Sequence, residues 1–351
     1  MEPTDAMFRI YPADTRYYYH QLTDNEKRLF SEFYDCVAAC RTEVFVQGRY
    51  TLAEYDHALN AIWKDCPEFI HQYGGVSYSS NGNYLTSVNF GYSMSKAELD
   101  NSVRQMVNRI QALKNDPDYG TSDFSKQYVI YRHLIRNNYY DCEKEYCGEA
   151  NSTWLLGYGS CQGYTRGLNL ALRYHGIQCC EIGGVAGGGG HCWTGINLDG
   201  IWYHCDVTWD DPVVADNPAN DPFDRMPAYL PYMNIPEAVM MRNRTLDIAG
   251  GFSIPRCTSM THNYAVQNGA YHAAGTGDAR TAIHNSMTRA YQAGQDCFMI
   301  LFESQSDYLN ARNNLTQHLR SWQYGGVQYN GCKWSDNDDV YMLQVYNLRF
   351  R

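Results

Sequence analysis

The sequence lacks three features that would point to particular partners or compartments. It has no run of Lys and Arg, and its formal net charge at pH 7 is −10, which argues against nucleic acid and anionic membrane surfaces as partners. No apolar stretch approaches the ~18 residues of a transmembrane helix. Residues 1–10 lack the basic start and apolar core of a signal peptide. We expect a cytoplasmic protein if the chain is complete, and a secreted one if a signal peptide has been removed.

Charged residues are also scarce, at 19% of the chain, whereas hydrophobic residues make up 44%. A chain of 351 residues with this balance can bury a sizeable core and has room for about two domains. The patterns predict an α+β protein with three regions. Residues 1–118 form a mostly helical region with a hairpin, 119–250 form a central core, and 251–351 form a C-terminal α+β region.

Local signals support the two outer regions. Thr23 followed by Glu26 is a capping box, which predicts a helix over 23–46. Asn81-Gly82 between alternating runs predicts a hairpin over 76–92. In the C-terminal region, hydrophobic periodicity predicts helices near 278–293 and 306–322, and strands at 297–303 and 341–350.

Cysteine is abundant, but its arrangement lacks a metal-site or disulfide signature. The 13 cysteines are scattered over the whole length and include no C-x-x-C pair. Disulfide frameworks are typical of short secreted chains, so we expect free thiols in a reducing compartment. Most of these side chains are then expected to be small buried hydrophobes.

One cysteine stands where a helix is predicted to begin. The segment 157–177, GYGSCQGYTRGLNLALRYHGI, predicts a glycine-rich turn, a helix start at Ser160-Cys161 and a stop at Gly176. A cysteine at a helix N-terminus lies at the positive end of the helix dipole, which lowers the pKa of its thiol and favours the nucleophilic thiolate. Cys161 is therefore a candidate nucleophile, and the alternative is a buried structural cysteine.

A hairpin is predicted for the stretch HCWTGINLDGIWYHCDVTW, which begins at His191. Asp199-Gly200 joins two alternating runs and is typical of a two-residue type I′ turn. The register that this turn imposes sets Trp193 opposite Asp206 and His191 opposite Thr208. A β-bulge would shift this register by one residue.

The same register predicts which side chains share a face. His191 and Asp206 are diagonal neighbours on one face, ~7–8 Å apart between backbones and within side-chain reach. Cys192 and Cys205 are expected to point to the opposite face, so we exclude both as nucleophiles.

An imidazole beside a carboxylate is the base and orienting half of a catalytic triad. In this interpretation Cys161 attacks a carbonyl carbon, His191 takes the thiol proton, and Asp206 orients the imidazole. The backbone N–H of Cys161 donates to the oxyanion, with the indole N–H of Trp154 as a candidate second donor. Candidate residues of the substrate cleft are Gln162, Gly190 and Trp193. No cofactor or metal ion is expected.

Four glycines, at 187–190, directly precede His191. Glycine loses more backbone entropy on folding than any other residue, so such a run is expected where a loop moves or a backbone comes close to something. We expect a mobile lip of the substrate cleft that lets a peptide backbone approach the imidazole. A flexible surface loop is the alternative.

These residues resemble the core motifs of the transglutaminase-like superfamily, and are most similar to its bacterial members described as cysteine peptidases. The motifs are a C-x-G-Y helix start at 161–164, an H-A-W strand at 191–193 and a W-Y-x-x-D-x-T-W strand at 202–209. Cys192 replaces the common alanine, and the glycine run is longer than usual. The resemblance covers 124–250, including a tyrosine-rich segment at 229–244.

The resemblance implies a papain-like α+β core in which the nucleophile helix packs on an antiparallel sheet, and the triad Cys161, His191 and Asp206. It also implies a thioester intermediate formed from peptide or protein amides. Water as the acceptor gives a peptidase or deamidase, and an amine gives a cross-linking transglutaminase. Hydrolysis is favoured because the resemblance is to the bacterial group and the sequence has no D-x-D-x-D-G calcium loop. The oligomeric state is left open.

Two other classes of function remain open at this point. Cys, His and Asp side chains are also zinc ligands, so the same three residues could bind a metal ion. A non-catalytic binding or scaffold protein could also be built on this core, although such proteins usually lose part of the triad. Metal analysis distinguishes the first class, and labelling with a thiol-reactive probe distinguishes the second.

Overall fold

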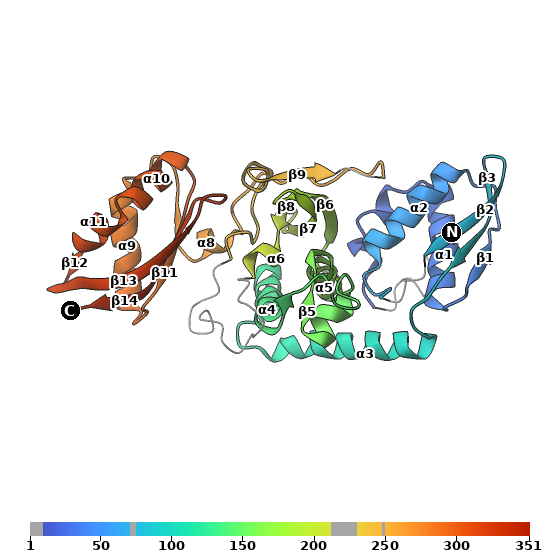
Figure 1. Cartoon of the computed structure of the whole chain (residues 1–351), viewed down its shortest axis with the longest axis horizontal. Helices are drawn as coiled ribbons and strands as arrows, with labels where there is room; N and C mark the ends of the chain where they lie inside the picture. The colour runs from blue at the N-terminus through green and yellow to red at the C-terminus, as the bar shows by residue number, and fades with distance from the viewer. Residues whose placement is uncertain (1–9, 71–74, 212–229, 248–249) are drawn as a thin grey trace. The chain divides into compact units, whose positions relative to one another are not determined.

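The computed structural model describes residues 10–70, 75–211, 230–247 and 250–351 (Figure 1). The chain folds into two compact units. The first unit comprises 1–221 and 244–257, and the second comprises 222–243 and 258–351. Our division into three regions ending at 118 and 250 stays a prediction. The mixture of helices and sheets confirms the α+β class.

The first unit begins with two helices and a small sheet. Helices α1 (Asp24–Ala38) and α2 (Leu52–Asp65) precede strands β2 (Val76–Asn81) and β3 (Tyr84–Phe90). The hairpin around Asn81-Gly82 is confirmed, and β1 (Glu43–Phe45) pairs with β3 on its other side. The capping box of Thr23 and Glu26 is present.

The predicted helix over 23–46 is too long. It ends at Ala38, and Cys40 then adopts a left-handed φ of 52° that no helix continues through. The residues after it form β1 because they pair with β3. Tertiary pairing has overridden the local helical pattern there.

The centre of the first unit carries the predicted papain-like core. Helices α3 (Lys96–Ala112) and α4 (Asp123–Asn137) lead through the short strands β4 (Tyr139–Tyr140) and β5 (Tyr158–Gly159) to α5 (Cys161–Tyr174). Helix α5 packs on an antiparallel sheet of order β8-β7-β6-β9 (Figure 1). The strands of this sheet are β6 (Cys179–Ala186), β7 (Gly189–Leu198), β8 (Ile201–Cys205) and β9 (Arg244–Asp247).

Helix α5 forms because one of its faces is apolar and a glycine ends it. The predicted core residues Tyr164, Leu168, Ala171 and Leu172 are all buried. Gly176 takes the expected left-handed conformation, with φ 78°, after the helix ends. Gly163 must be glycine, because a Cβ there would lie 2.1 Å from the carbonyl oxygen of Cys147.

A buried ion pair joins α5 to the N-terminal helices. Arg173 Nη2 lies 2.8 Å from Asp65 Oδ1, and both side chains are fully buried. Arg16 pairs in the same way with Glu68, at 3.2 Å. Removing one member of such a pair leaves an uncompensated buried charge. The Arg173–Asp65 pair therefore fixes the N-terminal part against α5, whereas the Arg16–Glu68 pair lies within the N-terminal part.

The hairpin of β7 and β8 has the predicted turn and register, but it is shorter than predicted. Asp199 and Gly200 both have positive φ, as a type I′ turn requires. Pairing runs from the turn only as far as Thr194 opposite Cys205. The chain then enters the short helix α6 (Val207–Asp210), so the expected pairs of Trp193 with Asp206 and His191 with Thr208 do not form.

The second unit has a sheet of its own, of order β10-β11-β14-β13-β12. Its strands are β10 (Tyr271–His272), β11 (Phe298–Phe302), β12 (Gln323–Tyr324), β13 (Val327–Asn337) and β14 (Met342–Phe350). Its helices are α7 (Glu237–Met240), α8 (Tyr264–Gln267), α9 (Ala279–Gln292), α10 (Gln305–Asn313) and α11 (Leu315–Arg320). The predicted helix over 306–322 is divided at Asn314 into α10 and α11.

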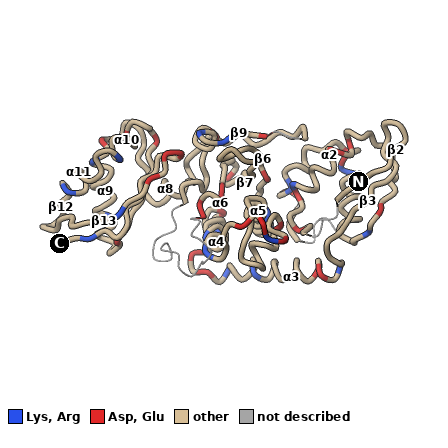
Figure 2. Tube along the Cα trace, viewed as in Figure 1, with Lys and Arg blue, Asp and Glu red and all other residues tan. Residues whose placement is uncertain are grey.

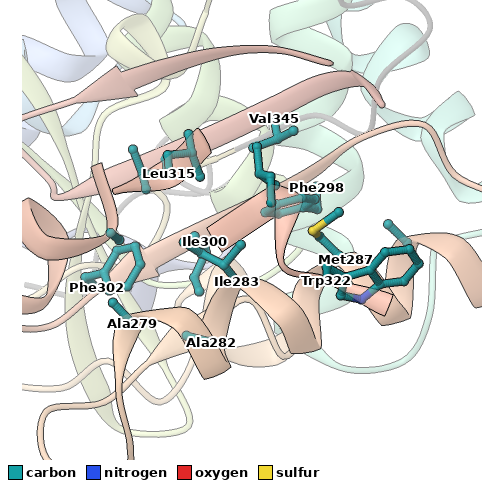
Figure 3. Close-up of a cluster of buried hydrophobic side chains, with 14 of the residues drawn as sticks. Ala279, Ala282, Ile283, Met287, Phe298, Ile300, Phe302, Leu315, Trp322 and Val345 are labelled. Atoms are coloured by element: carbon teal, nitrogen blue, oxygen red, sulfur yellow. The ribbon is translucent and has the colours of Figure 1, made fainter. Parts of the chain in front are cut away.

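The side chains between this sheet and α9, α10 and α11 form one hydrophobic cluster, part of which Figure 3 shows. Ile283 and Met287 of α9 meet Ile300 of β11 and Val345 of β14, and Trp322 joins them. The second unit therefore has a core composed of its own residues.

Two expectations concern the distribution of charge and the state of the cysteines. Figure 2 shows Lys and Arg interspersed with Asp and Glu along the trace rather than gathered on one element. All 13 cysteines are free thiols. Among the helices of the described chain, none combines the length and the apolar character needed to cross a membrane.

Candidate active site

Cys161 is the first residue of α5, and its thiol is half-buried. Ser160 precedes it as the N-cap residue, but its side chain does not cap the helix, because Ser160 Oγ donates to the Cys147 carbonyl at 3.2 Å. The first backbone N–H groups of a helix have no partner within the helix. The N-terminus of α5 therefore offers N–H donors and a positive dipole end beside the Cys161 thiol.

His191 lies near the start of β7, opposite Gly184 of β6. Its Nε2 lies 2.7 Å from Asp206 Oδ2. Trp193 stacks beside the imidazole, with ring centroids 6.0 Å apart and planes inclined by 27°. Since Nε2 is bound to the carboxylate, the other ring nitrogen, Nδ1, is left for the thiol of Cys161.

Asp206 directly follows β8 and is the N-cap residue of α6. Its Oδ1 accepts from the backbone N–H of Trp209 at 3.2 Å, and its Oδ2 accepts from His191. The carboxylate is 1% exposed. Asp206 is thus positioned by capping the N-terminus of α6, and not by the strand pairing that the sequence predicts.

The electrostatics of these groups favour a thiolate and an imidazolium. A hydrogen bond from Cys192, together with the hydrogen bond and charge of His191, lowers the pKa of Cys161 to about 4, although burial acts in the opposite direction. Burial lowers the pKa of His191, but hydrogen bonds to Asp206 and Cys161 outweigh it and raise that pKa to about 9. Between about pH 4 and pH 9 the Cys161 thiolate and the His191 imidazolium form an ion pair. The two protonation steps belong to the pair as a whole rather than to either residue.

Cys192 lies beside Cys161, not remote from it as its predicted face suggests. Its carbonyl accepts from Thr165 Oγ1 at 3.2 Å, and its Sγ lies 3.7 Å from the same oxygen, one turn into α5. The hydrogen bond to Cys161 and burial both raise the pKa of Cys192 well above its usual value. Cys192 therefore stays a thiol, which agrees with its exclusion as a nucleophile, and its side chain lies against the first turns of α5.

Two of the candidate cleft residues are committed elsewhere. The indole N–H of Trp154 donates to the Gly167 carbonyl at 2.9 Å, so Trp154 has no proton to offer an oxyanion. The indole N–H of Trp193 donates to His204 Nδ1 at 3.0 Å, and the ring is buried. The donor role expected of Trp154 is therefore corrected, whereas the cleft role of Trp193 stays a prediction.

The roles of the other two candidates stay predictions. Gln162, the residue after Cys161, is half-buried, and Gly190 is exposed in β7 opposite Val185 of β6. The glycine run as a whole is not a long loop. Gly187 and Gly188 form the two-residue turn of the β6–β7 hairpin, and the next two glycines belong to β7.

Arg244 is the residue of this site that sequence reasoning missed. It begins β9, and its Nη2 donates to Asp206 Oδ2 at 2.7 Å. Its guanidinium Cζ lies 4.2 Å from the ring centroid of Trp209. The only sequence signal is its place at the end of the tyrosine-rich segment, because nothing local links it to a carboxylate 38 residues earlier.

The geometry argues against a metal site. Within the described ranges, no group of three or more His, Cys, Asp or Glu side chains is arranged to hold a metal ion. The Asp206 oxygen nearest His191 is already bonded to a guanidinium, which would repel a metal cation at the same position.

The family of this region follows from its sequence. Residues 106–207, which include Cys161, His191 and Asp206, match the family model of the Transglutaminase-like superfamily. This part of the chain belongs to that superfamily. No curated protein matches the chain.

Three solved structures resemble this chain at low identity. A crystal structure of a TGase is 12% identical over 53% of this chain and 55% of its own, with a TM-score of 0.29. A proposed cysteine protease from Cytophaga hutchinsonii is 11% identical over 48% and 67%, with a TM-score of 0.27. A proposed protease from Parabacteroides distasonis is 14% identical over 40% and 30%, with a TM-score of 0.24. The chain thus spans about half the length of the first structure, and similarity at this level carries no argument about chemistry.

Proposed function

We propose that this protein is a cysteine acyl-transfer enzyme with the triad Cys161, His191 and Asp206, and that it hydrolyses peptide or protein amides. The observation that carries the proposal is the 2.7 Å contact of His191 Nε2 with Asp206 Oδ2, together with a cysteine at the start of α5. The lowered pKa of Cys161 and the raised pKa of His191 support it. A nucleophile, a base and an orienting group in contact are the arrangement that acyl transfer requires.

The proposed reaction has two halves. The Cys161 thiolate attacks the amide carbonyl carbon and forms a C–S bond, and the His191 imidazolium gives its proton to the leaving amine as the C–N bond breaks. Water then attacks the thioester, His191 takes a proton from it, and the C–S bond breaks to release a carboxylic acid. The backbone N–H groups at the start of α5 are the proposed oxyanion donors, because the Ser160 side chain leaves them uncapped.

Hydrolysis is proposed over cross-linking on the sequence argument, since the motifs resemble the bacterial peptidase group and a calcium loop of the D-x-D-x-D-G type is missing. A cross-linking transglutaminase has the same first half-reaction and differs only in the acceptor. The two are separated by supplying glutamine-containing peptides with and without a primary amine, and measuring ammonia, carboxylic acid and amide-linked products.

The first test is the pH dependence of Cys161 alkylation by iodoacetamide. The thiolate is the reacting form, so a pKa of about 4 predicts rapid, selective labelling well below pH 7. His191→Ala is expected to slow the labelling at acid pH, and Cys161→Ala to abolish it at this site. Labelling of Cys161 no faster than that of the other thiols would contradict the proposal and favour a non-catalytic scaffold.

A further inference from the structure

Arg244 shares one carboxylate oxygen with His191. Both Arg244 Nη2 and His191 Nε2 lie 2.7 Å from Asp206 Oδ2. The side chains of Arg244 and Asp206 are 0% and 1% exposed. A buried guanidinium therefore binds the same carboxylate oxygen as the imidazole.

The position of Arg244 is fixed by elements on opposite sides of the sheet. It pairs with Ala186 of β6 at one edge, whereas Asp206 follows β8 at the other edge. The Arg244–Asp206 contact thus joins residues attached to the two edge strands of the sheet. The Trp209 ring lies against the guanidinium at 4.2 Å, which combines a cation–π contact with the ion pair.

Arg244 is the positive partner of Asp206 in this site. The thiolate of Cys161 and the imidazolium of His191 form one pair, and Asp206 and Arg244 form a second. Burial and the charge of Arg244 lower the pKa of the neighbouring His204 to about 4, so His204 is neutral at pH 7. Among the other titratable side chains, Tyr131 interacts with Asp206 and donates to Asp210. Tyr140 and Cys192 interact with Cys161, and Glu181 acts on Cys192.

We propose that Arg244 is a positioning residue of this site, which holds the Asp206 carboxylate against His191 and balances its charge. The inference rests on the proposed function, because it assigns a role in the same reaction. Arg244 does not touch the reacting atoms. Its effect passes through Asp206 to His191 and from there to the thiol.

The test replaces the positive charge and measures two titrations. The pKa of Cys161 is measured from the pH dependence of its alkylation, and the pKa of His191 by NMR of the labelled imidazole. In Arg244→Met, loss of a nearby positive charge makes protonation of both groups easier, so both pKa values are expected to rise by about one unit. Arg244→Lys keeps the charge and is expected to leave both values near those of the unchanged protein, with slower turnover because the planar fork is lost.

Matched variants separate charge from packing. Arg244→Gln removes the charge with a smaller change in shape, and is measured if Arg244→Met does not fold. Arg132→Met is the control, because Arg132 also binds carboxylates, those of Asp116 and Asp118, away from the candidate triad. It is expected to leave both titrations unchanged.

The outcomes distinguish this inference from the proposed function. If the unchanged protein labels rapidly at acid pH but the neutral Arg244 variants keep both pKa values, the site is assembled and Arg244 is only a packing residue. A fall of the His191 pKa alone in those variants would support the positioning role, because the Asp206 carboxylate that raises this pKa would then have moved away from the imidazole. If the unchanged protein shows no enhanced labelling, the proposed function fails and this inference fails with it.

Discussion

Among single residues, Cys192 has the largest effect on the candidate nucleophile. Its hydrogen bond is the foremost of the influences that lower the pKa of Cys161. It stands where the resemblance leads us to expect alanine, a side chain that has no hydrogen to donate. The acidity of Cys161 in this chain is thus attributed partly to a residue outside the triad.

Replacing Cys192 by Ala is expected to raise the pKa of Cys161 from about 4. A hydrogen bond to a charged group is worth about 1.5–3 kcal/mol, which corresponds to roughly one to two pKa units. The measurement is the pH dependence of Cys161 alkylation, which should move to higher pH by that amount. Cys180→Ala is the control, since Cys180 is buried in β6 of the same sheet. An unshifted profile in Cys192→Ala would show that His191 alone sets the acidity.

The contrast between Cys161 and Arg244 shows which site residues a sequence reveals. Cys161, His191 and Asp206 belong to a helix start and a hairpin, two local patterns with definite geometry. Their assignment as a triad stays a prediction, although the structure brings them into contact. Arg244 and the location of Cys192 depend on the packing of β9 and α5, for which the sequence has no local signal.

Among the elements, the two hairpins of the core differ in how far their sequences determine them. Asp199-Gly200 sets the register of β7 and β8 because only a few turns join strands through two residues. The point at which pairing stops is not encoded in the turn. The Asp206 side chain caps α6, and this local alternative competes with continued strand pairing.

Replacing each glycine of the run by Ala is expected to lower the free energy of unfolding at two positions and to leave it nearly unchanged at the other two. Gly187 and Gly188 have φ of 58° and 83°, which costs an L-residue about 1–2 kcal/mol each. Gly189 and Gly190 lie in β7, and a Cβ on either meets no atom within 4 Å, so replacement there should change the free energy of unfolding by less than about 0.5 kcal/mol. Urea denaturation of the four variants measures the difference.

The same variants test the idea that this run lines the substrate cleft. If the glycines serve only the turn, Gly189→Ala and Gly190→Ala should leave catalytic efficiency unchanged. A loss of efficiency without a loss of stability would support a role in approaching the substrate. Equal destabilisation at all four positions would contradict the division into turn and strand.

For the whole molecule, the sequence predicts the fold class but not the contacts between residues that are far apart in the chain. The α+β class and the core helix follow from periodicity and end signals. The link between α2 and α5 does not, because Arg173 and Asp65 are 108 residues apart and each is an ordinary charged residue in the sequence. The sequence does not predict strand β13 either, since all of its residues are exposed or half-buried and its pattern is not apolar.

Because each unit has its own buried core, we expect a core defect to stay within the unit that carries it. Ile300→Ala in the cluster of the second unit should cost about 2–5 kcal/mol there. Ile182→Ala, at an equally buried position of β6, should do the same in the first unit. Urea unfolding of the first unit would be followed by the loss of rapid Cys161 alkylation. Unfolding of the second unit would be followed by the fluorescence of Trp322, in a Trp334→Phe background that leaves Trp322 as the only tryptophan of that unit. A matched protein that also lacks Trp322 gives the fluorescence background. Ile300→Ala should lower only the second midpoint and Ile182→Ala only the first, whereas equal shifts of both midpoints in either variant would show that the two units unfold as one cooperative block.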